Sequence, residues 1–283
     1  MCPVFDEHKM KCDLRLCERL LGISLSESQV SSLLGRMGIR YGKGVAIIPP
    51  YRVDILHPVD LVEDIAIAYG FENFKPEFSG KATIAVANPM ESFKSKLADV
   101  LVGLGFLETF TYHLTSVQNQ AQKMMMHPNL VLVANAQLSE NEALRRSLLP
   151  NLLSVLFENK HNEYPQRVFD CGVVFSPDKN SETGVEESQL LGMLSCHERA
   201  DFTEARQIVE ALGSGLGVVW EYREEIHPSF IEGRCASLWL GGKKVGVLGE
   251  IHPSVLENFG IITPTVGCEL SLTEVFNEIQ KMV

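Results

Sequence analysis

Four acidic residues lie close enough in the sequence to bind a divalent cation together. Asp60, Glu63 and Asp64 have the spacing i, i+3 and i+4, which places them on one face of a helix, and Asp54 lies in the extended run just before it. Like charges at this spacing repel by about 0.2–0.5 kcal/mol per pair, so the cluster needs a favourable interaction that offsets this repulsion. Mg²⁺ is one candidate because it takes carboxylate oxygens. The helix dipole, which favours acids in a first turn, is the other. The spacing alone leaves both open.

The segment 48–74 must position these acids, and its pattern predicts a strand followed by a helix. Val53 and Ile55 alternate with polar residues, which is the period of a half-buried strand. Pro58 suits the first turn of a helix, where a missing N–H costs nothing. Gly70 suits its end, because glycine adopts the left-handed backbone there.

The same segment resembles the signature of the phenylalanine–tRNA ligase beta-subunit family. That signature is an extended Pro-x-Arg-x-Asp-Ile run followed by Asp-Leu-(Val/Ile)-Glu-(Asp/Glu) and, later, Tyr-Gly. The matching positions here are Arg52, Asp54, Asp60, Leu61, Glu63, Asp64, Tyr69 and Gly70. The resemblance implies that Asp54, Asp60, Glu63 and Asp64 form a Mg²⁺ site shared with an alpha subunit.

Composition bounds the class of protein. The chain has 283 residues, which is enough for two domains, and we place a junction at 75–81, with a small domain over 1–78 and a larger one over 79–283. The net charge is −11, divided as −2 and −9 between these parts, so neither carries the basic footprint of a phosphate-binding protein. Seven scattered cysteines without a Cys-x-x-Cys pair indicate reduced thiols and a cytoplasmic protein. No apolar run is long enough for a membrane span.

The fold class that we expect is α+β. A helix over 26–37, glycine-rich turns and the acidic helix indicate a small winged-helix-like domain. In the larger part, a helix over 89–104, a strand over 109–114, another over 131–134 and a hairpin around Gly241-Gly242 indicate an antiparallel sheet flanked by helices.

The larger part also resembles the beta-subunit family. The matching stretches are ALRRSLLPNLL at 143–153, RVFDCGVVF at 167–175 and GRCASLWLGGKKVGVLGEIHP at 233–253, so that the similarity covers nearly all of residues 10–280. It implies a catalytic-like module of the class II synthetase fold. By the same resemblance, the helix at 89–104 would lie at a subunit interface.

The residues of an active class II site are missing from the expected places. Such a site holds the α-phosphate of ATP with an arginine after its second-motif strand, where a guanidinium donates in a fixed fork. Here GVVF is followed by Ser176, and the closing segment 267–276 has no arginine to stack on adenine. We therefore assign no catalytic or cofactor-binding residue.

The pair Arg145-Arg146 is expected at the surface or an interface, with RNA contact as a weaker alternative.

The resemblance implies a function. The chain would be the C-terminal half of an archaeal- or eukaryotic-type beta subunit and a non-catalytic structural part of it. It would support the alpha subunit, in a heterotetramer of two alpha and two beta chains, in ATP-dependent attachment of phenylalanine to tRNA. It would meet tRNA through that complex and bind no membrane. One alternative is a stand-alone winged-helix nucleic-acid-binding module, which the acidic net charge disfavours. Another is an independent class II ligase, which Ser176 disfavours because it stands at the position of the expected arginine.

Overall fold

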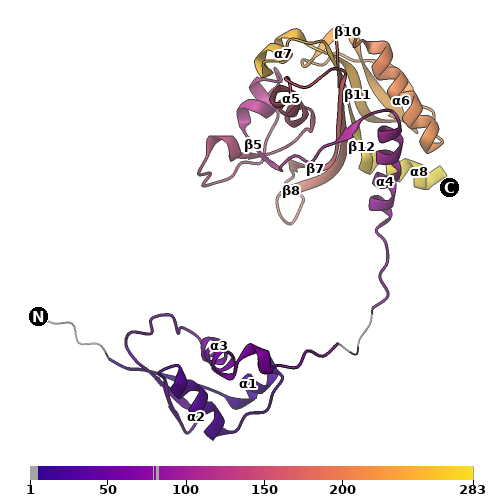
Figure 1. Ribbon diagram of the computed structural model, residues 1–283. Coiled ribbons are helices and arrows are strands. Elements are labelled where there is room, and N and C mark those ends of the chain that lie inside the picture. The colour runs from indigo at the N-terminus through magenta and orange to yellow at the C-terminus, as the bar shows by residue number, and fades with distance from the viewer. Residues whose placement is uncertain (1–5, 79, 81–82, 283) are drawn as a thin grey trace, which may run out of the picture. The chain divides into compact units, whose positions relative to one another are not determined.

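A computed structural model describes residues 6–78, 80 and 83–282 of the chain (Figure 1). It divides into two compact units, Met1–Ile84 and Ala85–Val283. The sequence placed the division at residue 78, within a junction of which residues 79 and 81 lie outside the described part. Within the described ranges, none of the helices is long and apolar enough to cross a membrane.

The small unit combines helices with a three-stranded antiparallel sheet of order β1-β3-β2. Its elements are β1 (His8–Lys11), α1 (Leu14–Leu21), α2 (Glu27–Arg36), β2 (Arg40–Gly42), β3 (Val45–Ile48), α3 (Pro58–Tyr69) and the 3₁₀ turn η1 (Phe71–Asn73). Apolar side chains from all three helices and from the sheet form one core, which includes Val30, Leu34, Ile48, Leu61 and Ile65. The winged-helix-like description of this unit stays a prediction.

Capping side chains fix where the helices of the small unit begin. Ser26 and Gln29 form a reciprocal capping box at α2, as the sequence predicted. At α3 the cap is His57, whose Nδ1 atom accepts from the Val59 N–H, while Asp60 bonds back to the backbone of His57. These bonds satisfy N–H groups that a helix start leaves without partners.

The strand expected around Val53 and Ile55 is wrong. This stretch forms turns, in which Val53 is 80% exposed and Ile55 is buried. The backbone gives the reason. The Arg52 N–H donates to the Pro49 carbonyl and closes a turn, and the N–H groups of Leu56 and His57 donate to Asp60 instead of to a neighbouring strand. Alternating apolar residues were therefore not sufficient evidence of a strand, because the backbone N–H groups find other acceptors nearby, among them the Asp60 side chain.

The large unit is built on a seven-stranded sheet of order β4-β7-β8-β12-β11-β10-β9, in which only β4 and β7 run parallel. Its strands are β4 (Leu107–Glu108), β7 (Gln166–Pro177), β8 (Val185–Cys196), β9 (Glu221–Glu224), β10 (Phe230–Leu240), β11 (Lys243–Ile251) and β12 (Thr265–Ser271). The expected hairpin around Gly241-Gly242 is confirmed as β10–β11. Both glycines have positive φ, which a two-residue turn between strands requires.

Helices cover both faces of this sheet (Figure 1). One face carries α4 (Pro89–Gly103), α6 (Phe202–Leu216) and α8 (Leu272–Met282) over the larger apolar core. The other carries α5 (Leu149–Glu158) and α7 (Pro253–Phe259) over a second core that includes Leu152, Leu153 and Phe230. The α+β class with an antiparallel sheet flanked by helices is thus confirmed, with one parallel edge strand.

Helix α4 faces its own chain. Phe93, Leu97 and Leu101 of its apolar stripe are buried in the core that α4 shares with α6, and the remaining stripe residues pack against the same core. The apolar stripe is therefore explained by packing within this chain, and the subunit interface that the resemblance implies for this helix stays a prediction.

The stretch between α4 and α5 is less regular than predicted. In place of a strand over 109–114 the structure has β4 and the short β5 (Leu114–Thr115), which pairs with β6 (Ala143–Leu144). The strand expected at 131–134 is reduced to a single bridge between Leu132 and Ala143. The π-helical turn η2 (Gln118–Gln122) and the 3₁₀ turn η3 (Ser139–Asn141) complete this stretch.

Candidate functional site

Arg52 joins two of the four acids that the sequence grouped. Its guanidinium donates to Asp54 through Nε and Nη2, at 3.0 and 2.8 Å, and its Nη2 atom lies 3.1 Å from Oδ1 of Asp64. Oδ2 of Asp64 lies 2.8 Å from the same nitrogen, but outside hydrogen-bonding direction. Nη1 reaches the carbonyl of Met37 at 3.4 Å. One cation therefore bridges the loop before α3, the helix itself and the end of α2.

The other two acids point elsewhere. Oδ2 of Asp60 accepts from the backbone N–H groups of Leu56 and His57, at 2.8 and 2.7 Å, so this carboxylate caps α3. Glu63 is exposed on the helix surface. Across residues 6–78, 80 and 83–282, no three histidine, cysteine or acidic side chains gather in a group that could hold a metal ion. The geometry does not fit one Mg²⁺ bound by all four acids, because Arg52 already supplies the positive charge.

The two carboxylates at Arg52 differ in environment. Asp54 is exposed, and its hydrogen bonds from Arg52 lower the pKa of its carboxyl. Asp64 is 5% exposed, and burial raises its pKa although Arg52 opposes the shift. Arg52 is a position of the sequence motif. Its separation from Asp64 by twelve residues and a turn gave no signal that the two would pair.

In the large unit, Ser176, the position at which the resemblance leads us to expect the arginine of an active class II site, lies near the end of β7. Ser176 lies opposite Glu186 in the strand register, and Phe175 lies opposite Glu187. Both glutamates are exposed. No arginine occurs in β12 or α8, the elements of the closing segment. Glu186 and Glu187 therefore place two carboxylates beside the end of β7 that contains Ser176.

Arg145 is buried, with 2% of its surface exposed, so the expectation of a surface or interface residue is wrong. Its Nε donates to the Val173 carbonyl at 2.7 Å, and Nη1 donates to Oγ1 of Thr111 at 2.7 Å and to Oδ2 of Asp170 at 3.2 Å. A Cβ at Gly172 would collide with the guanidinium, so glycine is needed there. Burial lowers the pKa of Arg145, and Asp170 opposes the shift.

A second ionic cluster surrounds Glu204 in the first turn of α6. Its carboxylate lies 2.6 Å from Nε2 of His197, 2.9 Å from Nη2 of Arg167 and accepts from the Ser195 hydroxyl at 2.9 Å. Burial alone would raise the pKa of Glu204, but these three hydrogen bonds outweigh it and lower the pKa. Ser195 donates to this carboxylate and to no imidazole among the described residues, so the cluster lacks the hydroxyl–imidazole contact that activates a serine nucleophile.

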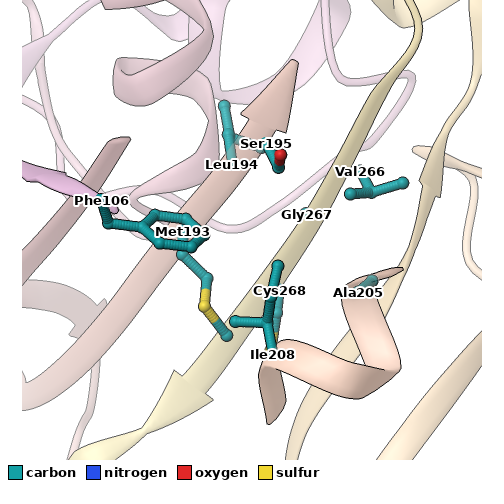
Figure 2. A pocket seen from close by; sticks show the side chains of 9 residues that line it. All are labelled: Phe106, Met193, Leu194, Ser195, Ala205, Ile208, Val266, Gly267 and Cys268. Atoms are coloured by element: carbon teal, nitrogen blue, oxygen red, sulfur yellow. The ribbon is translucent and has the colours of Figure 1, made fainter. Parts of the chain in front are cut away.

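The gap that Figure 2 shows between β8, β12 and α6 is a packing feature of the core. Apolar side chains such as Phe106, Met193 and Ile208 line it, together with the thiol of Cys268 (Figure 2). It encloses about 10 Å³, roughly the space of one water molecule. It therefore has no room for a substrate or cofactor.

Comparison with known protein families assigns both units. Residues 77–272 match the family model described as the phenylalanyl-tRNA synthetase beta chain CLM domain, and residues 10–71 match the tRNA synthetase B5 domain. The phenylalanine–tRNA ligase beta subunit of Pyrococcus abyssi is 35% identical over 97% of this chain and 50% of its own length. That of Archaeoglobus fulgidus is 37% identical over 98% and 51%. The chain thus spans about half the length of these relatives.

Solved structures support the fold of the large unit. A pyrrolysyl-tRNA synthetase from Desulfitobacterium hafniense aligns with a TM-score of 0.58 at 17% identity, over 69% of this chain and 70% of that one. A second structure of a pyrrolysyl-tRNA synthetase from the same organism aligns with a TM-score of 0.56 at 19% identity. At such identities the similarity extends to the fold and not to the chemistry.

Proposed function

The chain belongs to the phenylalanyl-tRNA synthetase beta-chain family, and we propose from this that it is a non-catalytic structural part of a phenylalanine–tRNA ligase beta subunit. In this role it supports an alpha subunit that carries out ATP-dependent attachment of phenylalanine to tRNA. The match to beta subunits over 97–98% of the chain supports the role as part of a synthetase. The heterotetramer, the contact with tRNA and the cytoplasmic location stay predictions.

Ser176 carries the non-catalytic part of the proposal. A serine hydroxyl cannot replace a guanidinium that neutralises and clamps a phosphate. Glu186, its partner across the β7–β8 register, adds a negative charge at the same place. Arg145 does not substitute for the missing arginine, because its guanidinium is bonded inside the protein to Asp170, Thr111 and Val173.

Exposed apolar side chains beside β4 support assembly with a partner chain. Phe110 and Tyr112 are 92% and 88% exposed, and Leu107 is 68% exposed. They lie within six residues of one another at the edge of the sheet, where β4, in the part of the chain that the structure describes, pairs on its β7 side alone. Large apolar residues that gather at a surface mark protein interfaces. We take this segment, residues 107–112, as a surface that meets the alpha subunit.

The Mg²⁺ at Asp54, Asp60, Glu63 and Asp64 stays a prediction, and the arrangement of these side chains does not favour it. Calorimetric titration of the chain with MgCl₂, alone and with an alpha subunit present, tests it directly. A four-acid site requires that Glu63→Gln weaken Mg²⁺ binding, whereas Glu72→Gln, on the neighbouring turn η1, serves as the matched control. Identical titrations for both variants and the parent would exclude the site.

The proposed function is tested by combining the chain with the alpha subunit of a related archaeal enzyme. We expect a complex by mass and background ATP–pyrophosphate exchange from the chain alone with phenylalanine. Exchange by the chain alone that follows the protein through purification would contradict the non-catalytic assignment. Failure to form a complex, with each chain folded by circular dichroism, would contradict the scaffold assignment.

A further inference from the structure

Cys12 and Cys17, in the small unit, are the only two cysteines within the described part of the chain whose thiols contact each other. Their Sγ atoms lie 4.0 Å apart, close enough for one thiol to donate to the other. The start of α1 brings them together. Asp13 is the N-cap of this helix, so Cys12 is the residue before the cap and Cys17 is the fourth residue of the helix. Residues at these two positions commonly pack against each other and fix the direction in which the chain enters a helix.

Backbone hydrogen bonds hold the two cysteines on either side of the cap. The Cys12 N–H donates to the carbonyl of Gly44, in the turn between β2 and β3, at 2.9 Å, and the Cys17 N–H donates to the Asp13 carbonyl at 3.2 Å. Both side chains are buried in the core of the small unit, with 2% and 1% of their surface exposed. A bond between the two sulfurs would therefore join the end of β1 directly to α1.

The Cys17 thiol differs in acidity from the cysteines of the large unit. Its hydrogen bond with Cys12 lowers the pKa of Cys17, although burial opposes the shift. Because the thiolate is the form of cysteine that attacks an oxidant, Cys17 is the preferred nucleophile among the described cysteines. In the large unit, burial raises the pKa of every described cysteine, namely Cys171, Cys196, Cys235 and Cys268.

Local opening of α1 gives access to the pair. This helix has eight residues, fewer than the about 12–15 that an isolated helix needs for stability, so it can open without unfolding of the whole unit. A surface groove of about 480 Å³ lies beside it, and among its lining residues are the sequence neighbours of the two cysteines, Lys11, Asp13 and Leu16. Opening of this segment admits a molecule as small as hydrogen peroxide. The same movement lets the sulfurs approach from 4.0 Å to the roughly 2.05 Å of a disulfide bond.

We propose that Cys12 and Cys17 are a site of reversible oxidation, at which hydrogen peroxide converts the two thiols into a disulfide. The Cys17 thiolate attacks one peroxide oxygen and the O–O bond breaks. Cys17 becomes a sulfenic acid, and the other oxygen leaves as hydroxide, which takes the proton that Cys17 had lost. The Cys12 sulfur then displaces the sulfenic hydroxyl, which leaves as water with the Cys12 proton. The two sulfurs together lose two electrons, one peroxide is reduced to two waters, and a thiol reductant reverses the bond.

Peptide mapping of the reduced, full-length chain after treatment with hydrogen peroxide tests the proposal. We expect the intact mass to fall by that of two hydrogen atoms and to return with dithiothreitol. Trypsin cleaves after Lys11, Arg15 and Arg19, so it separates the two cysteines. After alkylation of the remaining thiols, peptides 12–15 and 16–19 should therefore appear joined. Recovery of these two peptides unlinked, with both cysteines alkylated or with Cys17 carrying only added oxygen, would overturn the proposal.

Variants separate a reacting pair from a single reactive thiol. Cys12→Ala and Cys12→Ser should abolish the mass loss and allow oxidation of Cys17 to sulfinic acid, because no second thiol displaces the sulfenic hydroxyl. Cys235→Ala, which removes a buried thiol of the large unit, is the matched control and should form the link between peptides 12–15 and 16–19 as the parent does. Circular dichroism before treatment shows which variants are folded, and the map of the parent decides by itself if neither Cys12 variant folds. A mass loss that persists in both Cys12 variants, or loss of the link in Cys235→Ala, would show that the reactive pair lies elsewhere.

Discussion

Arg52 neutralises Asp64, the most deeply buried acid of the small unit, with Nη2 lying 3.1 and 2.8 Å from the two carboxylate oxygens. The carboxylate is 7% exposed and the guanidinium 18%, so water screens this pair far less than a surface pair. The relationship ties the loop that follows β3 to α3, and it makes the small unit dependent on one arginine.

Replacing Arg52 with glutamine should therefore destabilise the small unit. Removing one partner of a buried ion pair costs about 3–5 kcal/mol, and the partial exposure of Arg52 favours the lower end. Arg40→Gln, which breaks an exposed pair with Glu7, should cost about 0–1 kcal/mol. Urea unfolding followed by hydrogen exchange in residues 6–78 measures both.

Both tryptophans, Trp220 and Trp239, lie in the large unit, so their fluorescence provides the internal control. The fluorescence transition should be the same in the Arg52→Gln protein and the parent. Equal stability of the two arginine variants in the small unit would show that Arg52 is only a surface partner of Asp54.

The adjacent arginines of the large unit offer a matched comparison. Arg145→Met leaves Asp170 buried without its cation and should cost about 3–5 kcal/mol, whereas Arg146→Gln alters an exposed residue and should stay within about 0.5 kcal/mol. Denaturant unfolding followed by tryptophan fluorescence measures both. If the two substitutions have the same effect, the hydrogen bonds of Arg145 do not stabilise the sheet.

Acidification should weaken the large unit through Glu204. The folded-state pKa of this carboxyl is lowered, so its contribution to stability is complete above the unfolded pKa of about 4.3 and is lost as the pH falls through the folded value. Glu204→Gln should make the stability of the large unit less dependent on pH in this range. Glu210→Gln, on the same helix but exposed, should retain it. Thermal unfolding between about pH 6 and pH 3 gives the profiles, and parallel curves for the two variants would contradict the assignment.

Truncation of the apolar segment beside β4 should affect assembly and not folding. The double variant Phe110→Ser, Tyr112→Ser should unfold like the parent but bind the alpha subunit at least about tenfold more weakly, since aromatic anchors contribute strongly to interfaces. Ile262→Ser removes another fully exposed apolar residue and should leave binding unchanged. Unchanged binding by the double variant would place the interface elsewhere.

Leu101→Ala, by contrast, should lower the free energy of unfolding by about 2–5 kcal/mol, because Leu101 is buried in the core.

The sequence predicted elements well where one local signal decided them. The capping box at Ser26, the proline that begins α3 and the Gly241-Gly242 turn each appear as expected. It failed where residues distant in the chain decide the outcome. Whether Arg145 is buried depends on Asp170, twenty-five residues away, and Asp64 pairs with Arg52 across a turn. The direction of a side chain across a turn is set by tertiary packing, and the spacing of apolar residues along the sequence carries no information about it.

The order of strands in the large sheet also governs when that sheet can form. The central strand β8 (Val185–Cys196) pairs on one side with β7 (Gln166–Pro177), which is adjacent in the chain, and on the other with β12, which begins at Thr265. Since long-range pairing requires closure of a long loop, this step should be slow relative to hairpin formation. During synthesis the β7–β8 hairpin emerges well before its second partner. Its β12-facing edge, with Leu191 and Met193, then lacks its second partner, and an unpaired strand edge of this kind is prone to aggregation until β12 is made.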